Sequence, residues 1–562
     1  MQEEAVSTQL AKKVRNRSLI GTAERPHSQR DAARQRLVGG GFPLDTSPVQ
    51  ASESRTLRRS LGFRVPGLSV PRPRRRDAID RELQLRWGSP TVGKKDQTRI
   101  RELTDALEAR VGLRLHDGRT QFGKRVSFDD AKDLPFHRWY FYKEGFSPQL
   151  LGLIISKLEL PGRGGFLDPF AGVGTSVFSA TRLANQPFSH AYGVEYNPFA
   201  RFVGETKLRW RSVQPRRLRE LIDMIEQHRP KRLPPIPHSA TLRNRRIFSP
   251  SRMRALLQIR AGIDQFTRPG AERDVLRLAL ASVLESASFA KKDGRALRIV
   301  SKHERPAPPR DLFRTALQTI ARDIEEELEQ DKLRTFMRQR PRRLRARIYR
   351  GDARKLPKAI KKESISLALY SPPYLNGIDY SEVYKVEEYM LGFIHSNAEL
   401  HSLREGTLRS HASIRFPSRS STLATFGGQA LVRRVLREIA AFIEKYESRP
   451  FQKQYVWLVP AYFADMADAM KEQFRVLKTG GYAVCVVANS MLAGPALATV
   501  RDGVKAQRYS KWQLPIPTDV IIAGIAKAIG FEVHRSYVVR ALYPRNVTRS
   551  SSRESILIFR KP

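Results

Sequence analysis

The most constraining feature of the chain is an apolar segment that runs directly into two consecutive prolines. Residues 364–370 read Ser-Ile-Ser-Leu-Ala-Leu-Tyr, and Ser371-Pro372-Pro373-Tyr374 follows at once. The apolar run has the length and composition of a buried parallel strand. It must end at the prolines, because neither can donate to a sheet ladder. Ser371 and Tyr374 are therefore expected at the carboxyl end of a central strand, where open α/β sheets bind ligands.

The charge of the chain indicates what kind of partner it binds. The 562 residues include 101 Lys and Arg against 56 Asp and Glu, a formal net charge of +45. This excess favours a polyanion, with nucleic acid as the first candidate and an anionic membrane surface as the second. No apolar run is long enough for a transmembrane helix, and the first residues lack a signal-peptide pattern. The single cysteine, Cys485, allows no internal disulfide, which fits a reducing cytosol, so we expect a cytoplasmic protein.

A glycine-containing turn forms a second motif upstream. Residues 166–175 read Phe-Leu-Asp-Pro-Phe-Ala-Gly-Val-Gly-Thr, which predicts a short strand ending at Asp168, a tight turn, and a helix over 176–183. Glycines at such a turn let backbone N–H groups approach a ligand at the positive end of the helix dipole. The pattern departs from Gly-x-Gly-x-x-Gly and has no Gly-Lys-Ser/Thr, which argues against a nicotinamide dinucleotide and a P-loop. No Cys/His cluster has zinc spacing, so no metal site is expected.

Two further acids end predicted strands. Tyr192-Gly193-Val194-Glu195 predicts a second strand, and a carboxylate at its end can accept hydrogen bonds from both hydroxyls of a ribose. Residues 347–350 predict a third strand, followed closely by Asp352. A surface position is the alternative for each acid.

Taken together, these segments resemble the motifs of the S-adenosylmethionine-dependent DNA amino-methyltransferases of the N4-cytosine and N6-adenine type. Residues 168–175 match their cofactor motif, and Ser371–Tyr374 their catalytic motif. Phe146-Ser147-Pro148, ahead of an apolar helix, resembles the motif that touches the methionine end of the cofactor. The resemblance covers about residues 136–210 and 345–562. It implies an α/β fold with a Rossmann-like class I methyltransferase sheet of strand order 3-2-1-4-5-7-6.

The resemblance also assigns roles to residues. It implies that S-adenosyl-L-methionine binds to Phe146, Ser147, Asp168, Pro169, Phe170, Ala171, Gly172, Gly174, Thr175, Glu195 and Asp352. It implies that Ser371, Pro372, Pro373 and Tyr374 carry the catalysis. The Ser371 side chain and the Pro372 carbonyl would accept from an exocyclic amino group, and Tyr374 would stack on a base turned out of the duplex. Cys485 lies in a buried-looking strand, which disfavours C5-cytosine chemistry through a thiolate.

The target is less tightly defined. Serine at the first position of the catalytic motif leans, by resemblance, toward cytosine N4 in double-stranded DNA, with adenine N6 as the alternative. An RNA base methyltransferase of the guanosine-N2 type shares similar motifs. A catalytically idle nucleic-acid-binding protein on the same fold is the non-enzyme alternative. A cognate restriction or defence partner is conceivable, and the target sequence and the oligomeric state stay open.

The composition divides the chain into four regions. Residues 1–85 are expected to form a basic disordered arm, 86–135 an N-terminal helical lead-in, and 136–212 with 345–562 the catalytic domain. Residues 213–344 show helical periodicity and many arginines, which predicts a basic helical insert that could recognise the target. Beyond the catalytic motif, Tyr380 and Tyr384 are four residues apart, so they share a face if this segment is helical, and they either line a base pocket or pack on the sheet. The polar, basic stretch 400–425 suits phosphate or base contacts.

Overall fold

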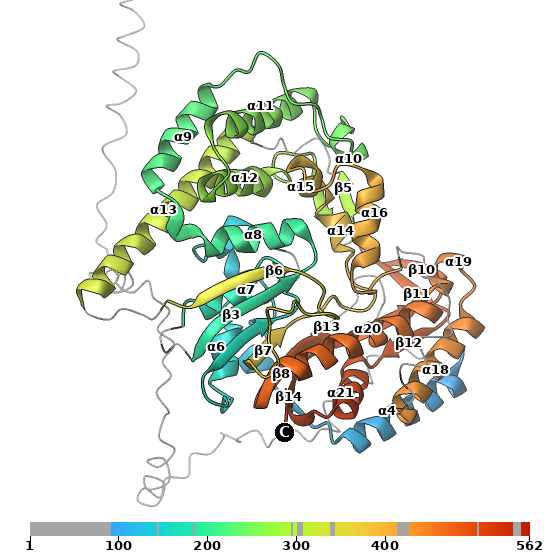
Figure 1. The fold of residues 1–562 in the computed structure, drawn as a ribbon. Coiled ribbons are helices and arrows are strands. Elements are labelled where there is room, and N and C mark those ends of the chain that lie inside the picture. The colour runs from blue at the N-terminus through green and yellow to red at the C-terminus, as the bar shows by residue number, and fades with distance from the viewer. Residues whose placement is uncertain are drawn as a thin grey trace, which may run out of the picture. The chain divides into compact units, whose positions relative to one another are not determined.

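An eight-stranded sheet organises the part of the chain that the structure describes (Figure 1). This computed structural model describes residues 92–562 except 143–144, 184, 186, 294–295, 300–306, 338–342, 413–425, 427, 503–504 and 543–551. The expected basic arm, 1–85, lies outside the described residues. Within them, no helix is both long and apolar enough to cross a membrane.

The strand order is β1-β13-β14-β8-β7-β2-β3-β6. The strands are β1 (Leu115–Asp117), β2 (Gly164–Asp168), β3 (Phe188–Glu195), β6 (Arg345–Arg350), β7 (Ile365–Tyr370), β8 (Leu477–Ala488), β13 (Glu532–Leu542) and β14 (Ser552–Arg560). All run parallel except β14, which pairs antiparallel with both β13 and β8. Counted from β2 and leaving β1 aside, the order is 3-2-1-4-5-7-6. The predicted Rossmann-like methyltransferase fold is therefore confirmed.

Alternating side chains of the central strands enter two different cores. Leu367 and Leu369 of β7 belong to a cluster with α6 (Leu150–Ile155) and α7 (Thr175–Ala180). Ala368 and Tyr370 belong to a second cluster with α4 (Lys94–Val111), α18 (Ala430–Tyr446), α20 (Tyr455–Val476) and α21 (Thr518–Ile529). All six residues of β7 are buried, as its apolar sequence predicts for a strand covered on both faces.

The segment expected as a helical lead-in contributes to the sheet. After α4, the three residues of β1 pair in parallel with β13, with Leu115 opposite Ser536. The short helix α5 (Arg119–Phe122) then buries Phe122 completely. A strand of three residues is too short to show an alternating pattern, so periodicity alone does not predict it.

The insert is helical, as its periodicity predicts. It contains α9 (Pro215–Gln227), α10 (Ala240–Arg243), α11 (Pro250–Phe266), α12 (Ala271–Val283) and α13 (Pro309–Phe336), with a hairpin of β4 (Ala290–Asp293) and β5 (Ala296–Ile299). Its core is continuous with the catalytic part, since Leu276 and Phe313 share one cluster with Phe199 of α8 (Pro198–Leu208) and Tyr389 of α15 (Lys385–Met390). Figure 1 shows α8 next to α12 and above the β6 edge of the sheet.

Helix α20 contains a proline. It begins at Tyr455 and carries Pro460 inside it. Proline removes one helical hydrogen bond; here the flanking residues Val459 and Ala461 are buried, and packing maintains the helix. The remaining elements are α14 (Tyr380–Val383), α16 (Asn397–Gly406), α19 (Pro450–Lys453), the short 3-10 turns η1 (Asp129–Lys132), η2 (His137–Trp139) and η3 (Trp210–Ser212), and the paired strands β9 (Ser490–Ala493) with β12 (Gln513–Ile516) and β10 (Ala496–Asp502) with β11 (Lys505–Ser510).

Candidate active site

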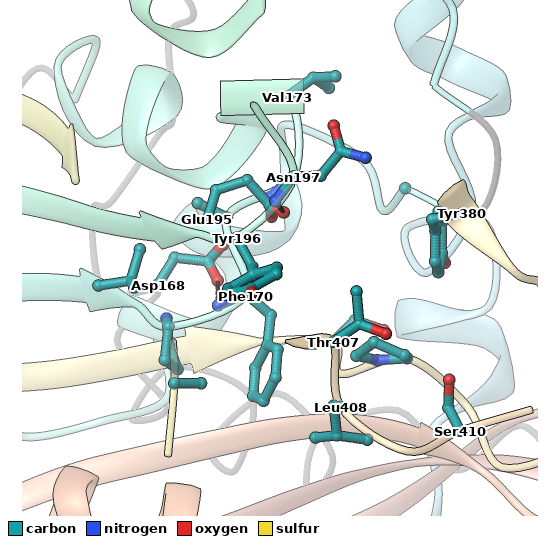
Figure 2. A pocket seen from close by; sticks show the side chains of 18 of the residues that line it. Asp168, Phe170, Val173, Glu195, Tyr196, Asn197, Tyr380, Thr407, Leu408 and Ser410 are labelled. Atoms are coloured by element: carbon teal, nitrogen blue, oxygen red, sulfur yellow. Dashed lines mark hydrogen bonds between the residues drawn. The ribbon is translucent and has the colours of Figure 1, made fainter. Parts of the chain in front are cut away.

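A cleft lies at the carboxyl ends of β2, β3, β6 and β7 (Figure 2). We call one side of the cleft the strand-end side; it consists of residues 168–173, 175–176, 194–197, 351–353, 371 and 373. We call the opposite side the loop side; it consists of residues 378–381, 406–408 and 410–411. Tyr142, Gly145 and Phe146 complete the lining. Figure 2 shows Asp168 and Glu195 across the cleft from Tyr380 and Ser410.

The turn after β2 depends on two glycines in the left-handed region. Gly172 has φ 50° and Gly174 has φ 75°, a conformation that side chains with a Cβ rarely adopt. The N–H of Gly172 donates to Glu195 Oε2 at 2.8 Å. Gly174 does not line the cleft. A Cβ on Gly174 would lie 2.7 Å from Ile348 Cδ1, so this glycine allows close packing of the turn against β6.

Asp168 is buried at the end of β2. Its Oδ1 accepts from Phe170 N at 3.0 Å, and its Oδ2 accepts from Ser176 Oγ. Burial raises the pKa of Asp168 to about 7, although these hydrogen bonds lower it. A carboxyl group with this pKa gains a full negative charge when a cation comes close.

Glu195 ends β3 and is held by backbone donors on both oxygens. Its Oε1 accepts from Asn197 N at 2.7 Å, and Oε2 accepts from Gly172 N. Burial raises the pKa of Glu195, and the bonds from Asn197 and Gly172 counteract that rise. Because each carboxylate oxygen can accept more than one hydrogen bond, both keep the capacity to accept from a ligand hydroxyl.

Asp352 follows β6 and lines the cleft. Its carboxylate already accepts hydrogen bonds from Arg354. Arg354 Nε and Nη2 lie 3.0 Å from Oδ1 and 2.7 Å from Oδ2 of Asp352. Arg354 also donates to Asp465 Oδ2 at 3.0 Å and to the Gly406 carbonyl at 2.8 Å. This one side chain therefore connects the third strand end to α20 and to the loop side.

Ser371 and Pro373 line the cleft directly after β7, whereas Pro372 and Tyr374 do not. The Tyr374 ring packs against the hydrophobic core. Its hydroxyl donates to Glu554 Oε1 at 2.6 Å and lies 3.3 Å from Ser371 Oγ. Burial and the Glu554 charge raise the pKa of Tyr374 well above its ordinary value. In this structure the tyrosine of the motif is therefore held at β14, away from the cleft.

Two other tyrosines lie at the cleft and stack on each other. Tyr142 and Tyr380 both line it, with ring planes 11° apart and centroids 5.9 Å apart. Tyr384 stacks behind Tyr142 at 5.2 Å and is buried. Each of the two alternatives thus holds for one tyrosine: Tyr380 lines the cleft, and Tyr384 packs in the core. Tyr142 was not singled out from the sequence, and its place in an aromatic segment before the cofactor motif was the available signal.

Phe146 and Ser147, both expected at the cofactor, have side chains in different places in the structure. Phe146 lines the cleft, whereas Ser147 is fully buried and donates to Asp130 Oδ2 at 2.6 Å. Helix α6 begins at Leu150, two residues after Pro148. Ser147 Oγ accepts from Gln149 N at 3.2 Å, so it stabilises the turn ahead of the helix.

The loop side contains polar groups that no motif indicates. Burial lowers the pKa of His411, and the nearby Asp379, whose Oδ1 lies 3.7 Å from His411 Nε2, raises it. Arg404 Nε pairs with Asp379 Oδ2 at 2.9 Å. His411 belongs to the stretch 400–425 for which phosphate or base contacts were expected, and its part 413–425 lies outside the described residues.

Cys485 is buried in β8, and burial raises the pKa of its thiol to about 12. At neutral pH this sulfur is a thiol and not a nucleophilic thiolate. Cys485 also lies outside the lining of the cleft.

Comparisons with known proteins agree with this architecture. No family model matches the chain. It is 26% identical over 494 residues to the type II methyltransferase M.AvaI of Nostoc sp. (strain PCC 7120 / SAG 25.82 / UTEX 2576), covering 82% of this chain and 94% of the relative. It is 24% identical over 485 residues to the type II methyltransferase M.BsoBI of Geobacillus stearothermophilus, covering 78% and 88%.

Among solved structures, the rRNA methyltransferase aviRa from Streptomyces viridochromogenes overlaps 68% of this chain and 88% of its own at 11% identity. The TM-score of this overlap is 0.21. The similarity to the two type II enzymes extends over most of both chains and agrees with the strand order of the sheet. Over most of its length the chain is therefore similar to type II methyltransferases, and its sheet has the strand order of a methyltransferase fold.

Proposed function

We propose that the protein transfers a methyl group from S-adenosylmethionine to an exocyclic amino group of a base in double-stranded DNA, and that this group is cytosine N4. The observation that carries the proposal is the meeting of Ser371 with Asp168, Glu195 and Asp352 in one cleft, at the ends of four neighbouring strands. The net charge of +45 and the type II relatives support DNA as the substrate.

The three carboxylates of the strand-end side fit the groups of the cofactor. S-adenosylmethionine offers two ribose hydroxyls, an adenine amino group and positive charge. Glu195 would accept from the hydroxyls, Asp352 from the adenine amino group, and Asp168 would face the positive charge. When bound, the cofactor supplies an electrophilic methyl group on its sulfonium. The left-handed Gly172 leaves its own position free of a side chain at this side of the cleft.

Residues next to this site would prepare the amino group. An exocyclic amino lone pair is delocalised into its ring, so it is a weak nucleophile. A hydrogen bond from the amino group to Ser371 Oγ, which lines the cleft, favours a more pyramidal nitrogen, whose lone pair is available. The face of Tyr380 can stack on a base that has left the duplex. The gain comes mainly from proximity and orientation.

Methylation products test the proposal. Labelled S-adenosylmethionine is incubated with the protein and either duplex DNA or tRNA, and the modified nucleoside is identified by mass spectrometry. N4-methylcytosine in DNA is the expected product. N6-methyladenine would overturn the choice of base, label in tRNA alone would overturn DNA, and 5-methylcytosine would overturn the amino-group mechanism. Cofactor binding without transfer to either substrate would favour the idle nucleic-acid-binding protein.

The insert, residues 213–344, would recognise the target site in this proposal. Its helices carry exposed arginines, of which Arg216 has 93% of its side chain exposed. The test exchanges Arg216 and Arg217 for glutamate: weaker DNA binding with a shallower salt dependence supports the contact, and an unchanged slope contradicts it.

A further inference from the structure

The catalytic motif is connected to the last strand of the sheet by two hydrogen bonds in series. Tyr374 Oη donates to Glu554 Oε1 at 2.6 Å, and Ser371 Oγ lies 3.3 Å from Tyr374 Oη. Glu554 is 1% exposed on β14, directly opposite Arg540 of β13. Arg540 Nε lies 2.9 Å from Glu554 Oε2. A buried carboxylate, paired with the partly exposed Arg540, therefore lies at one end of these two hydrogen bonds, and Ser371, which lines the cleft, lies at the other.

The chemistry of these groups sets the direction of each hydrogen bond. An ionised carboxylate paired with a guanidinium can only accept, so the Tyr374 hydroxyl must donate to Glu554. Tyr374 Oη then has only acceptor capacity left, and the contact with Ser371 requires that Ser371 donates. The Tyr374–Glu554 bond is short and charge-assisted, whereas the Ser371–Tyr374 contact is long. The carboxylate therefore determines the orientation of both hydroxyls.

From this arrangement we infer that Glu554 is a positioning residue that makes Ser371 a hydrogen-bond acceptor toward the target amino group. The inference rests on the proposed function. A serine hydroxyl can donate or accept, but only acceptance from the amino group helps its nitrogen to react. With its hydrogen directed at Tyr374, Ser371 presents lone pairs to the cleft. A side chain with a carbonyl oxygen at position 371 accepts without such help.

A double-mutant cycle separates this role from a merely structural one. Glu554→Gln keeps the size of the side chain but adds an NH₂ donor. The side chain at position 554 then no longer forces Tyr374 to donate to it, nor Ser371 to donate to Tyr374. We expect this change to lower the single-turnover methylation rate about tenfold in the protein with Ser371, since a neutral hydrogen bond contributes about that much. In the Ser371→Asn background the same change should cost less than about threefold.

Tyr374→Phe interrupts the series without touching the Glu554–Arg540 pair, and we expect a similar fall with Ser371 in place. Tyr462→Phe is the matched control: Tyr462 is fully buried, and no hydrogen-bond partner of its hydroxyl is found among the described residues. This variant should keep the rate. Calorimetric affinity for S-adenosylmethionine and the melting temperature accompany every variant and should stay close to those of the unaltered protein.

The outcomes distinguish the inference from the proposed function. A fall that is large with Ser371 and small with Ser371→Asn supports the positioning role. Equal falls in both backgrounds would show that Glu554 only stabilises the fold, and they would overturn this inference while leaving the proposed function intact. An unaltered protein that methylates no nucleic acid would overturn the proposed function and the inference with it.

Discussion

The two sides of the cleft are built in different ways. On the strand-end side, Asp168 and Glu195 follow directly from buried strands, and backbone N–H groups from nearby turns hold their carboxylates. On the loop side, residues 406–411 are held by side chains from distant elements, including the Arg409–Asp465 ion pair at 2.6 Å. The strand-end side is thus organised by the sheet itself, while the loop side depends on a few polar contacts that a bound target could rearrange.

If this contrast is correct, the largest effect will come from filling the turn on the strand-end side. In Gly172→Asp, a Cβ at φ 50° would lie 3.0 Å from Tyr142 Cε1 and bring a carboxylate close to Glu195. We expect cofactor affinity to fall more than roughly 100-fold in this variant and in Asp168→Ala, with the fold retained. Calorimetry with S-adenosylmethionine and circular dichroism measure both quantities.

Gly162→Asp is the control for this pair. Gly162 has φ 54°, but a Cβ there meets nothing within 4 Å, so the variant carries the backbone strain without filling the cleft. Its cofactor affinity should be unchanged. If Gly172→Asp and Asp168→Ala also bind normally, the cofactor site is assigned to the wrong residues.

The next effect concerns chemistry without cofactor binding. Ser371→Ala removes the acceptor proposed for the target amino group, and we expect the single-turnover rate to fall roughly 100-fold. Affinity for S-adenosylmethionine should stay the same. Ser364→Ala, at the other end of the same strand region, is the control, because that hydroxyl bonds only locally, to the Lys361 carbonyl at 2.6 Å. A normal rate in Ser371→Ala would exclude the serine from catalysis.

A smaller effect should appear on the loop side. Tyr380→Ala removes a ring face from the cleft, and stacking on a base contributes about 1–3 kcal/mol. DNA binding should therefore weaken by roughly fivefold to 100-fold, with cofactor affinity unchanged and Tyr380→Phe close to normal. Fluorescence anisotropy with a labelled duplex measures this loss. Should Tyr374→Ala weaken DNA binding and Tyr380→Ala not, the stacking surface would be the tyrosine of the motif.

The smallest effect is a pH dependence confined to the strand-end side. The pKa of Asp168 is raised to about 7, so in the unliganded protein this carboxyl is mostly protonated at pH 6 and mostly ionised at pH 8. A cationic ligand favours the ionised form, and its binding must release the proton. Cofactor affinity should therefore rise about tenfold from pH 6 to pH 8 and level off above pH 7. Asp168→Asn should bind weakly with no such slope, and a slope retained in that variant would assign the titration to another group.

The contrast between the two sides also explains what the sequence could predict. The strands β2, β3, β6 and β7 and the acids that follow them depend on local patterns, so most of the lining on the strand-end side could be predicted from them. The strand order was implied by the family resemblance. The links made by Arg354 and Glu554 could not, because each joins residues far apart in the chain that show no periodicity. Ser147 and Tyr374 lie in the predicted segments, but long-range partners, Asp130 and Glu554, draw their polar atoms away from the cleft.

The pairing of β1 with β13 has a consequence for how the chain folds as it is made. The edge strand β1 can pair with β13 only after Ser536, the partner of Leu115, has been synthesised. During synthesis, β1 and the apolar face of α4, which packs on α18 and α21, stay without their partners until nearly the whole chain has left the ribosome. Contacts of such long sequence separation slow folding, and unpaired apolar surface invites aggregation meanwhile. Production at low temperature or with chaperones should therefore raise the soluble yield of this protein.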